Sequence, residues 1–211
     1  MRTRKVAMDS IHKLTEYFRD FPGIGPRQAK RFVYFLLTKN PSYLNEISRL
    51  ISDIKKNIKV CSLCFRFFQD EKTDEKNDVC NICSDKNRNH ESLMIVARDV
   101  DFESIEKSRV YSGLYFILGG TIPILEKEPE KKVRLEELKD RINKNNLKEV
   151  ILSLNMTPDG ENTADYIKQF IKQYFPNSNI KISLLGRGLS TGSEIEYADV
   201  ETIKSALENR I

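Results

Sequence analysis

The sequence predicts an α+β protein made of several parts in series. They are a helical amino-terminal segment, a four-cysteine segment, an α/β domain with a mostly parallel sheet, and a carboxyl-terminal tail that contains a helix. Helix-period apolar positions dominate the first 57 residues, all four cysteines lie between 61 and 83, and from residue 91 onward short apolar runs alternate with helical patterns. We therefore divide the chain into residues 1–57, 58–90, 91–186 and 187–211.

The amino-terminal segment should contain three helices, at 9–19, 26–38 and 42–56. Residues 1–8 are expected to form a loose basic tail, and Asp9 can cap the first helix. Pro26 suits the first turn of the second helix, and Pro41 ends that helix. Each helix has an apolar stripe that we assign to a core. The stripes are Met8, Ile11, Leu14 and Phe18; Ala29, Phe32, Val33, Leu36 and Leu37; and Leu44, Ile47, Ile51, Ile54 and Ile58.

The connection between the first two helices, FPGIGPR, has the pattern of a loop that holds a phosphodiester backbone. Its two glycines allow positive φ and close approach to a ligand, and the next helix offers unpaired N–H groups at its positive end. Such contacts bind phosphates without reading bases. The alternative is a plain helical corner with ordinary surface cations. The residues expected to bind DNA are Gly23, Ile24 (as the loop's anchor), Gly25, Arg27, Lys30 and Arg31.

The charge is distributed unevenly along the chain. The net charge is +4, but residues 1–67 carry 14 Lys and Arg against 5 Asp and Glu, whereas residues 68–211 carry 21 against 26. A basic front and a mildly acidic back suggest a polyanion on one side and a protein partner on the other. With no signal peptide and no apolar run long enough for a bilayer, the expected location is the cytoplasm, at the nucleoid, with no membrane partner.

The four cysteines are spaced as a metal site. Cys61-x-x-Cys64 and Cys80-x-x-Cys83 are separated by fifteen residues without further Cys or His, and two such pairs can place four sulfurs around one Zn²⁺. Two disulfides or four unrelated thiols are the alternatives, and the expected compartment and the paired spacing speak against them. We expect one structural zinc ion per chain, with the charged stretch 65–79 as a solvated excursion.

Beyond residue 91 the pattern predicts parallel βαβ units. Strands are expected at 92–97, 114–118, 149–154 and 180–185, and helices at 101–108, 131–145 and 163–174. Strands that are apolar throughout fit a sheet covered on both faces. A last helix is expected at 200–209, capped by Asp199.

Several strings of the sequence, in this order, resemble the bacterial recombination mediator family RecR. They are FPGIGPRQAKRF, the four cysteines, YSGLYFILGGTIPIL, LNMTPDGENTADYI and LLGRGLSTGSEIEYADVETIKSAL, which together cover nearly the full length. The resemblance implies a helix-hairpin-helix, a four-cysteine zinc finger and a Toprim domain. It also implies a ring-forming homodimer or homotetramer that binds DNA and acts with RecO-like and RecF-like proteins to load RecA on single-stranded DNA. Arg27 and Arg31 then stand at DNA-facing positions, and Lys30 adds a charge.

The sequence departs from that family after the first Toprim strand, where Ala97-Arg98-Asp99 replaces the usual acidic residue. Catalytic Toprim domains need that carboxylate for Mg²⁺, so we predict a protein that is not an enzyme. The alternative is a Mg²⁺-dependent Toprim nuclease or primase-like enzyme, with Asp99, Asp101, Asp159 and Glu161 as ligands. Neither His12 nor His90 is placed as a general base.

Asp159 and Glu161 are expected to form an acidic docking patch for a basic partner protein. The alternative is that both simply suit the first turn of a helix. The sequence leaves open the ring's closure, the preferred DNA strandedness and nucleotide binding near residues 187–196.

Overall fold

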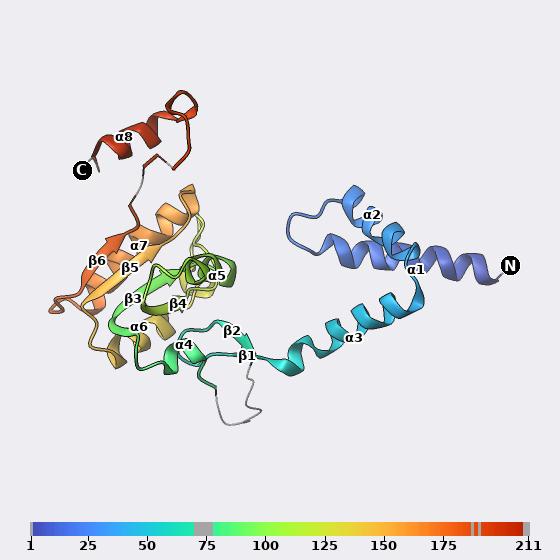
Figure 1. The fold of residues 1–211 in the computed structure, drawn as a ribbon, viewed down its shortest axis with the longest axis horizontal. Helices are drawn as coiled ribbons and strands as arrows, with labels where there is room; N and C mark the ends of the chain where they lie inside the picture. Colours follow the sequence, from blue (N-terminus) through green and yellow to red (C-terminus); the bar gives the residue numbers. More distant parts are fainter. Residues whose placement is uncertain (1, 70–77, 187, 190, 209–211) are drawn as a thin grey trace. The chain divides into compact units, whose positions relative to one another are not determined.

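A computed structural model describes residues 2–69, 78–186, 188–189 and 191–208. The chain forms two compact units, Met1–Asn57 and Ile58–Ile211, which are described separately below (Figure 1). The four-cysteine segment belongs to the same unit as the sheet. Within the described ranges, no helix combines the length and the hydrophobicity that crossing a bilayer requires.

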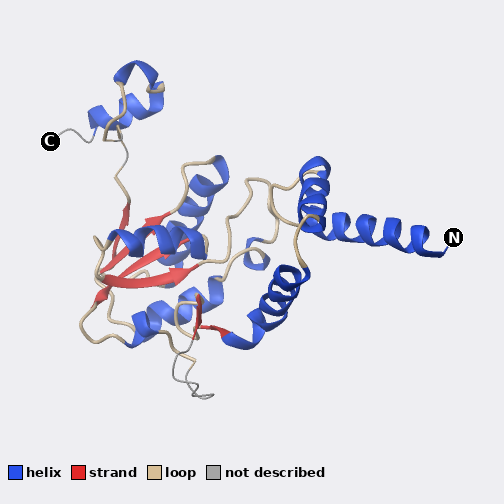
Figure 2. Ribbon diagram, turned by 45° about the vertical axis from the view of Figure 1, so that its right-hand side comes forward, coloured by secondary structure: helices blue, strands red, loops and turns tan. Residues whose placement is uncertain are grey.

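The first unit contains the three expected helices, α1 (Arg2–Arg19), α2 (Pro26–Leu37) and α3 (Pro41–Asn57) (Figures 1 and 2). The first helix starts earlier than expected. The prediction of a loose tail is therefore wrong for residues 2–8, and Asp9 lies inside the helix instead of capping it. That stretch, RTRKVAM, contains neither Gly nor Pro and is rich in good helix formers, so nothing in it stops the helix. Residue 1 lies outside the described residues.

The first two helices pack on each other, but α3 does not bury its apolar stripe. Ala29 and Val33 of α2 are buried, and the rings of Phe18 and Phe32 meet edge to face with centroids 5.8 Å apart. In α3 no residue is buried, and Ile51 is 66% exposed. The assignment of all three stripes to a core is therefore wrong for α3, and Leu14 of α1 and Leu37 of α2 are exposed as well. The side chain of Met8 lies outside the described side chains. Helical spacing shows that a face is apolar, but it does not show what covers the face.

The second unit is built on a four-stranded parallel sheet, as predicted. Its strands are β3 (Asn89–Val96), β4 (Gly113–Ile117), β5 (Glu149–Ser153) and β6 (Lys181–Leu184), in the order β4-β3-β5-β6. The helices α5 (Asp99–Ser108), α6 (Leu135–Lys144) and α7 (Pro158–Tyr174) connect successive strands (Figure 1). This confirms the α/β domain, and it leaves β4 at one edge of the sheet.

The two faces of the sheet belong to two separate cores, and both faces are covered as the apolar strands predicted. Leu93 and Ile95 of β3 point into a core built with α6 and α7, and their neighbours Met94 and Val96 point into a core built with α5 and the cysteine segment. The alternation follows from the period of two in a strand. The cysteine segment thus acts as part of the cover for one face of the sheet.

Two helices in this unit begin more than two residues away from their predicted starts. The expected helix 131–145 is a short 3₁₀ turn, Pro129–Lys131, followed by α6, which begins only at Leu135. The expected helix 163–174 begins at Pro158, because the Thr157 hydroxyl caps it by accepting a hydrogen bond from the N–H of Gly160 (3.2 Å). In the tail, a 3₁₀ turn (Ile195–Tyr197) precedes α8 (Val200–Glu208), and the predicted cap is confirmed by the bond from Thr202 N–H to Asp199 Oδ1 (2.9 Å). Residue 209 lies outside the described residues.

Candidate metal centre and nucleic-acid interface

The cysteines are positioned by a two-stranded ribbon and a single helical turn. The antiparallel strands β1 (Ile58–Val60) and β2 (Phe67–Gln69) bracket the turn that carries Cys61 and Cys64. Cys80 is the N-cap of α4 (Asn81–Ser84), and Cys83 lies within that turn of helix. These short elements were not predicted, because two three-residue strands leave no periodic signal. Residues 70–77, most of the expected excursion, lie outside the described residues.

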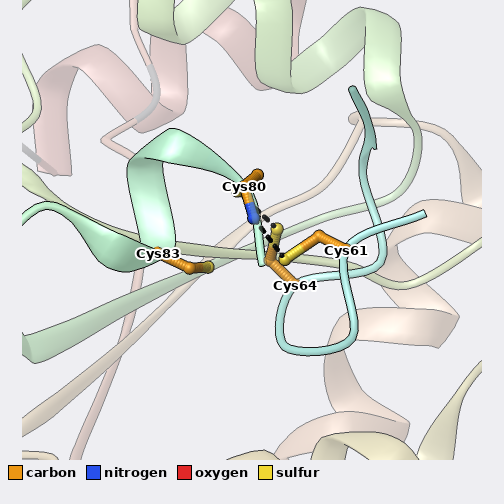
Figure 3. Close-up of side chains that lie close together, drawn as sticks. All are labelled: Cys61, Cys64, Cys80 and Cys83. Atoms are coloured by element: carbon orange, nitrogen blue, oxygen red, sulfur yellow. Dashed lines mark hydrogen bonds between the residues drawn. The ribbon is translucent and has the colours of Figure 1, made fainter. Parts of the chain in front are cut away.

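The four sulfurs converge on one point (Figure 3). They all lie within 4.8 Å of one another, and all four residues are buried. A tetrahedron of sulfurs around Zn²⁺, with Zn–S bonds of about 2.3 Å, has S···S separations of about 3.8 Å. The Sγ atoms of Cys64 and Cys80 are 3.6 Å apart, and all four cysteines are free. The cluster fits a metal ion with sulfur ligands, and it does not contain the two disulfides that were the alternative.

Hydrogen bonds inside the cluster favour thiolates at some positions. The contact with the Cys64 sulfur lowers the pKa of Cys61, and the same contact raises the pKa of Cys64, because one sulfur must donate its proton to the other. The backbone N–H of Cys80 also donates to Cys61 Sγ (3.3 Å). Amide donors aimed at sulfur stabilise the deprotonated form that binds a metal.

The cysteine segment is attached to the sheet domain by specific bonds. The N–H of Ile117, on the edge strand β4, donates to the carbonyl of Cys64 (2.8 Å), so the segment covers part of the edge. The N–H of Phe67 donates to Asp99 Oδ1 on α5 (2.9 Å). On the α6 side, the guanidinium of Arg141 donates to Cys83 Sγ (3.7 Å). Sequence reasoning missed Arg141, because nothing in a helical pattern relates it to a cysteine 58 residues away.

The candidate DNA loop has one left-handed glycine rather than two. Gly23 has φ +76°, while Gly25 has φ −81° and ψ 168° and is the N-cap of α2. The expectation that both glycines would supply positive φ is therefore wrong for Gly25. The space around both is open, since an added Cβ would meet no atom within 4 Å. Ile24 is half-buried, and its N–H donates to the carbonyl of Phe21 (3.1 Å), which closes the turn.

The cations of this loop are exposed at the positive end of α2. Arg27, Lys30 and Arg31 are all exposed, and the first turn of α2 holds no acidic side chain. Their spacing of three and four residues places them on neighbouring positions of one helix. Within the described part of the chain none of the three forms an ion pair; Lys30 lies 5.9 Å from the ring centroid of Tyr34. Their charge is thus available to an anion in solvent.

The acidic residues do not form a comparable cluster. Asp159 and Glu161 lie in the first turn of α7, on either side of the buried Gly160. Asp101 Oδ2 accepts the backbone N–H of Arg98 (3.0 Å), so Asp101, like Asp99, is engaged in a local structural bond. Among the described residues, the cysteine cluster is the only group of three or more Cys, His, Asp or Glu side chains close enough to share an ion.

Fold and site together define a Toprim-type α/β protein whose four-cysteine segment could hold a metal ion. In agreement, residues 91–186 match the family model described as "Toprim domain", and residues 188–211 match "RecR, C-terminal". The chain belongs to the RecR family of recombination proteins, because curated relatives of that name match it over nearly its full length.

Curated relatives named "Recombination protein RecR" match nearly the full length. The protein from Phytoplasma mali is 37% identical over 202 residues, which cover 95% of this chain and 94% of the relative. The protein from Brachyspira hyodysenteriae is 33% identical over 97% of each chain. The protein from Lactococcus lactis subsp. cremoris is 34% identical over 96% of this chain and 97% of the relative.

Proposed function

We propose that this chain is a non-enzymatic DNA-binding protein of recombinational DNA repair. The observation that carries the proposal is the exposed group Arg27, Lys30 and Arg31 beside an open, glycine-containing turn at the N-terminus of α2. Amide N–H groups at a helix N-terminus and nearby cations contact phosphates, and such contacts position a nucleic acid without reading its sequence. The place of action is the cytoplasmic nucleoid, where DNA is found.

The cysteine cluster holds one Zn²⁺ in this proposal, and its role is structural. Four sulfur ligands from Cys61, Cys64, Cys80 and Cys83 complete a tetrahedral shell, so no position remains open for a substrate. Zinc supplies cross-linking there and no reaction chemistry. The residues around it attach the segment to the sheet edge through Ile117 and to α5 through Asp99. The functional division into residues 1–57, 58–90, 91–186 and 187–211 belongs to the same proposal.

The protein acts as a homodimer or homotetramer, as a ring-like clamp on DNA. An apolar groove of about 860 Å³ in the first unit supports self-association. It is lined by all three helices, including Phe35, Tyr43 and Ile51, which the chain leaves exposed. Apolar surface of this extent favours burial against another protein surface. RecO-like and RecF-like proteins are the proposed partners in loading RecA, with Asp159 and Glu161 as the docking patch for a basic partner.

The DNA-binding proposal is tested by a charge reversal with a matched control. Arg27→Glu combined with Arg31→Glu should weaken binding of the full chain to a labelled oligonucleotide, measured by fluorescence anisotropy at several salt concentrations. Each lost phosphate contact should reduce the slope of log K against log[salt] by about 0.7 to 0.9. The control, Arg49→Glu with Lys55→Glu, makes the same charge change at exposed positions of α3. Equal losses in both variants would mean that only net charge matters and would refute the loop as the interface.

The wild-type protein also serves to test the alternative that the chain is a Mg²⁺-dependent Toprim nuclease, an alternative that the match to the Toprim family model leaves open. Labelled single- and double-stranded DNA incubated with the protein and Mg²⁺ or Mn²⁺ should remain intact. Cleavage that disappears in Asp159→Ala would establish a Toprim nuclease instead.

A further inference from the structure

A buried guanidinium lies against the cysteine cluster. Arg141 of α6 is only 5% exposed, and among the described residues it is the only charged side chain that is buried. Its Nη2 donates to Cys83 Sγ (3.7 Å), and its Nε has no hydrogen-bond partner. Glu137 and Asp140 line the small cavity of about 70 Å³ beside it, yet neither forms an ion pair with Arg141 in the described structure.

Such a position is unfavourable for a cation unless a negative charge accompanies it. Burying an unpaired charge costs several kcal/mol, and a neutral thiol compensates little of that cost. Four thiolates around one divalent cation carry a net charge of about −2, concentrated on the sulfurs. A guanidinium that donates to one of these sulfurs is then paired, and the hydrogen bond is strengthened by charge on both sides.

We propose that Arg141 is the counter-ion and positioning residue of the metal centre. The inference deepens the zinc proposal above and rests on it. The guanidinium neutralises part of the thiolate charge through Cys83, and it holds α6 against the cysteine segment more tightly when the metal is bound. Metal binding and the docking of α6 are therefore thermodynamically coupled, and each strengthens the other.

The surrounding contacts show how the coupling reaches the sheet. Phe65, which follows Cys64, has a positive φ of 63° and places its ring edge to face with Phe116 of β4, at a centroid distance of 5.5 Å. Ser62, Leu63 and Phe65 line one side of the cavity whose other side is α6. A change in the charge of the cluster therefore alters the packing of the cysteine segment against both α6 and the edge strand β4.

The test compares metal affinity and metal spectroscopy in the full chain. Arg141→Met removes the charge and the donor but keeps much of the side-chain volume. Arg141→Lys keeps the charge, and the control Lys172→Met removes a charge from an exposed position of α7. Zinc is competed from each protein with a chromophoric chelator. Loss of an outer-sphere partner typically weakens metal affinity by about 10- to 100-fold, and we expect this for Arg141→Met, partial recovery for Arg141→Lys and no change for Lys172→Met.

A second measurement separates positioning from simple packing. With Co²⁺ in the site, the sulfur-to-cobalt charge-transfer band should move to longer wavelength in Arg141→Met, because the sulfur loses a hydrogen bond that stabilises its electrons. A role in packing alone would leave this band and the affinity unchanged while lowering the melting temperature. That result would overturn the inference. Wild-type protein that binds no metal would instead refute the zinc proposal itself, so the two failures are distinguishable.

Discussion

Replacing Asp99 separates a structural role from a magnesium-binding role at the carboxyl end of β3. In the structure, Asp99 Oδ1 accepts the backbone N–H of Phe67 (2.9 Å) and lies in the first turn of α5. A hydrogen bond to a charged group contributes about 1.5–3 kcal/mol when buried, and we take about 1 kcal/mol here because the pair is partly exposed. The carboxylate at the helix N-terminus adds about 0.3–1 kcal/mol. Asp99→Ala should therefore lose about 1–2 kcal/mol.

The assay is thermal unfolding with and without MgCl₂. A loss of that size lowers the melting temperature by about 2–8 °C for a unit of this length. Asp99→Asn, which keeps an acceptor oxygen, should lose less, and the control Glu103→Ala at an exposed position of α5 should stay within about 0.5 kcal/mol.

Magnesium itself should change none of these melting temperatures selectively. A ligand present at about 100 times its Kd stabilises a protein by about 2.7 kcal/mol, which is easily measured. A rise of several degrees on adding Mg²⁺ to the wild type, absent in Asp99→Ala, would show that Asp99 is a metal ligand and refute its assignment as an anchor.

Three further outcomes are expected. Gly160→Ala should destabilise the second unit by about 3 kcal/mol or more in urea unfolding, because the new Cβ would overlap the carbonyl oxygen of Asn155. The control is Gly186→Ala, which has open space around it, and equal stability of the two variants would contradict the clash. Cys80→Ala should contain no zinc by elemental analysis. Proteases should cut this variant within residues 58–90, and they should cut the wild type there once a chelator has removed its metal. Full metal content in the variant would exclude Cys80 as a ligand. Burial raises the pKa of Tyr111 to about 12, so the folded state holds this proton more tightly than the unfolded state does. The free energy of unfolding should therefore be unaffected by this group below about pH 10 and should fall as the pH rises from about 10 to 12. In Tyr111→Phe the free energy of unfolding should depend less steeply on pH in that window.

The α/β domain could be predicted from sequence because its signals are local. The runs LMIVA and LYFIL are almost continuously apolar. Adjacent residues of β3 and β4 alternate between two cores, so both faces of the sheet favour apolar side chains. The cap at Asp199 was likewise predictable, since a capping residue acts on an N–H three residues away.

What sequence could not show depends on contacts between distant residues. Periodicity revealed the apolar stripe of α3 but could not show that Ile51 and Ile54 stay exposed in the chain. Cysteine spacing identified the ligands but not the attachment of Cys64 to the edge strand. The contact of Arg141 with Cys83 could not be predicted, because it joins residues 58 positions apart and an Arg in a helix is normally solvated.

The contacts around Ala97, the residue that follows β3, show why this position carries no carboxylate. Ala97 is buried, with 2% of its surface exposed, so a Glu there would place a carboxylate in a packed position. The nearby carboxylates of Asp99 and Asp101 bind backbone N–H groups, one from the cysteine segment and one from the start of α5. Asp99 therefore joins α5 to the cysteine segment, and Asp101 stabilises the first turn of α5, so both carboxylates have structural partners at this end of the sheet.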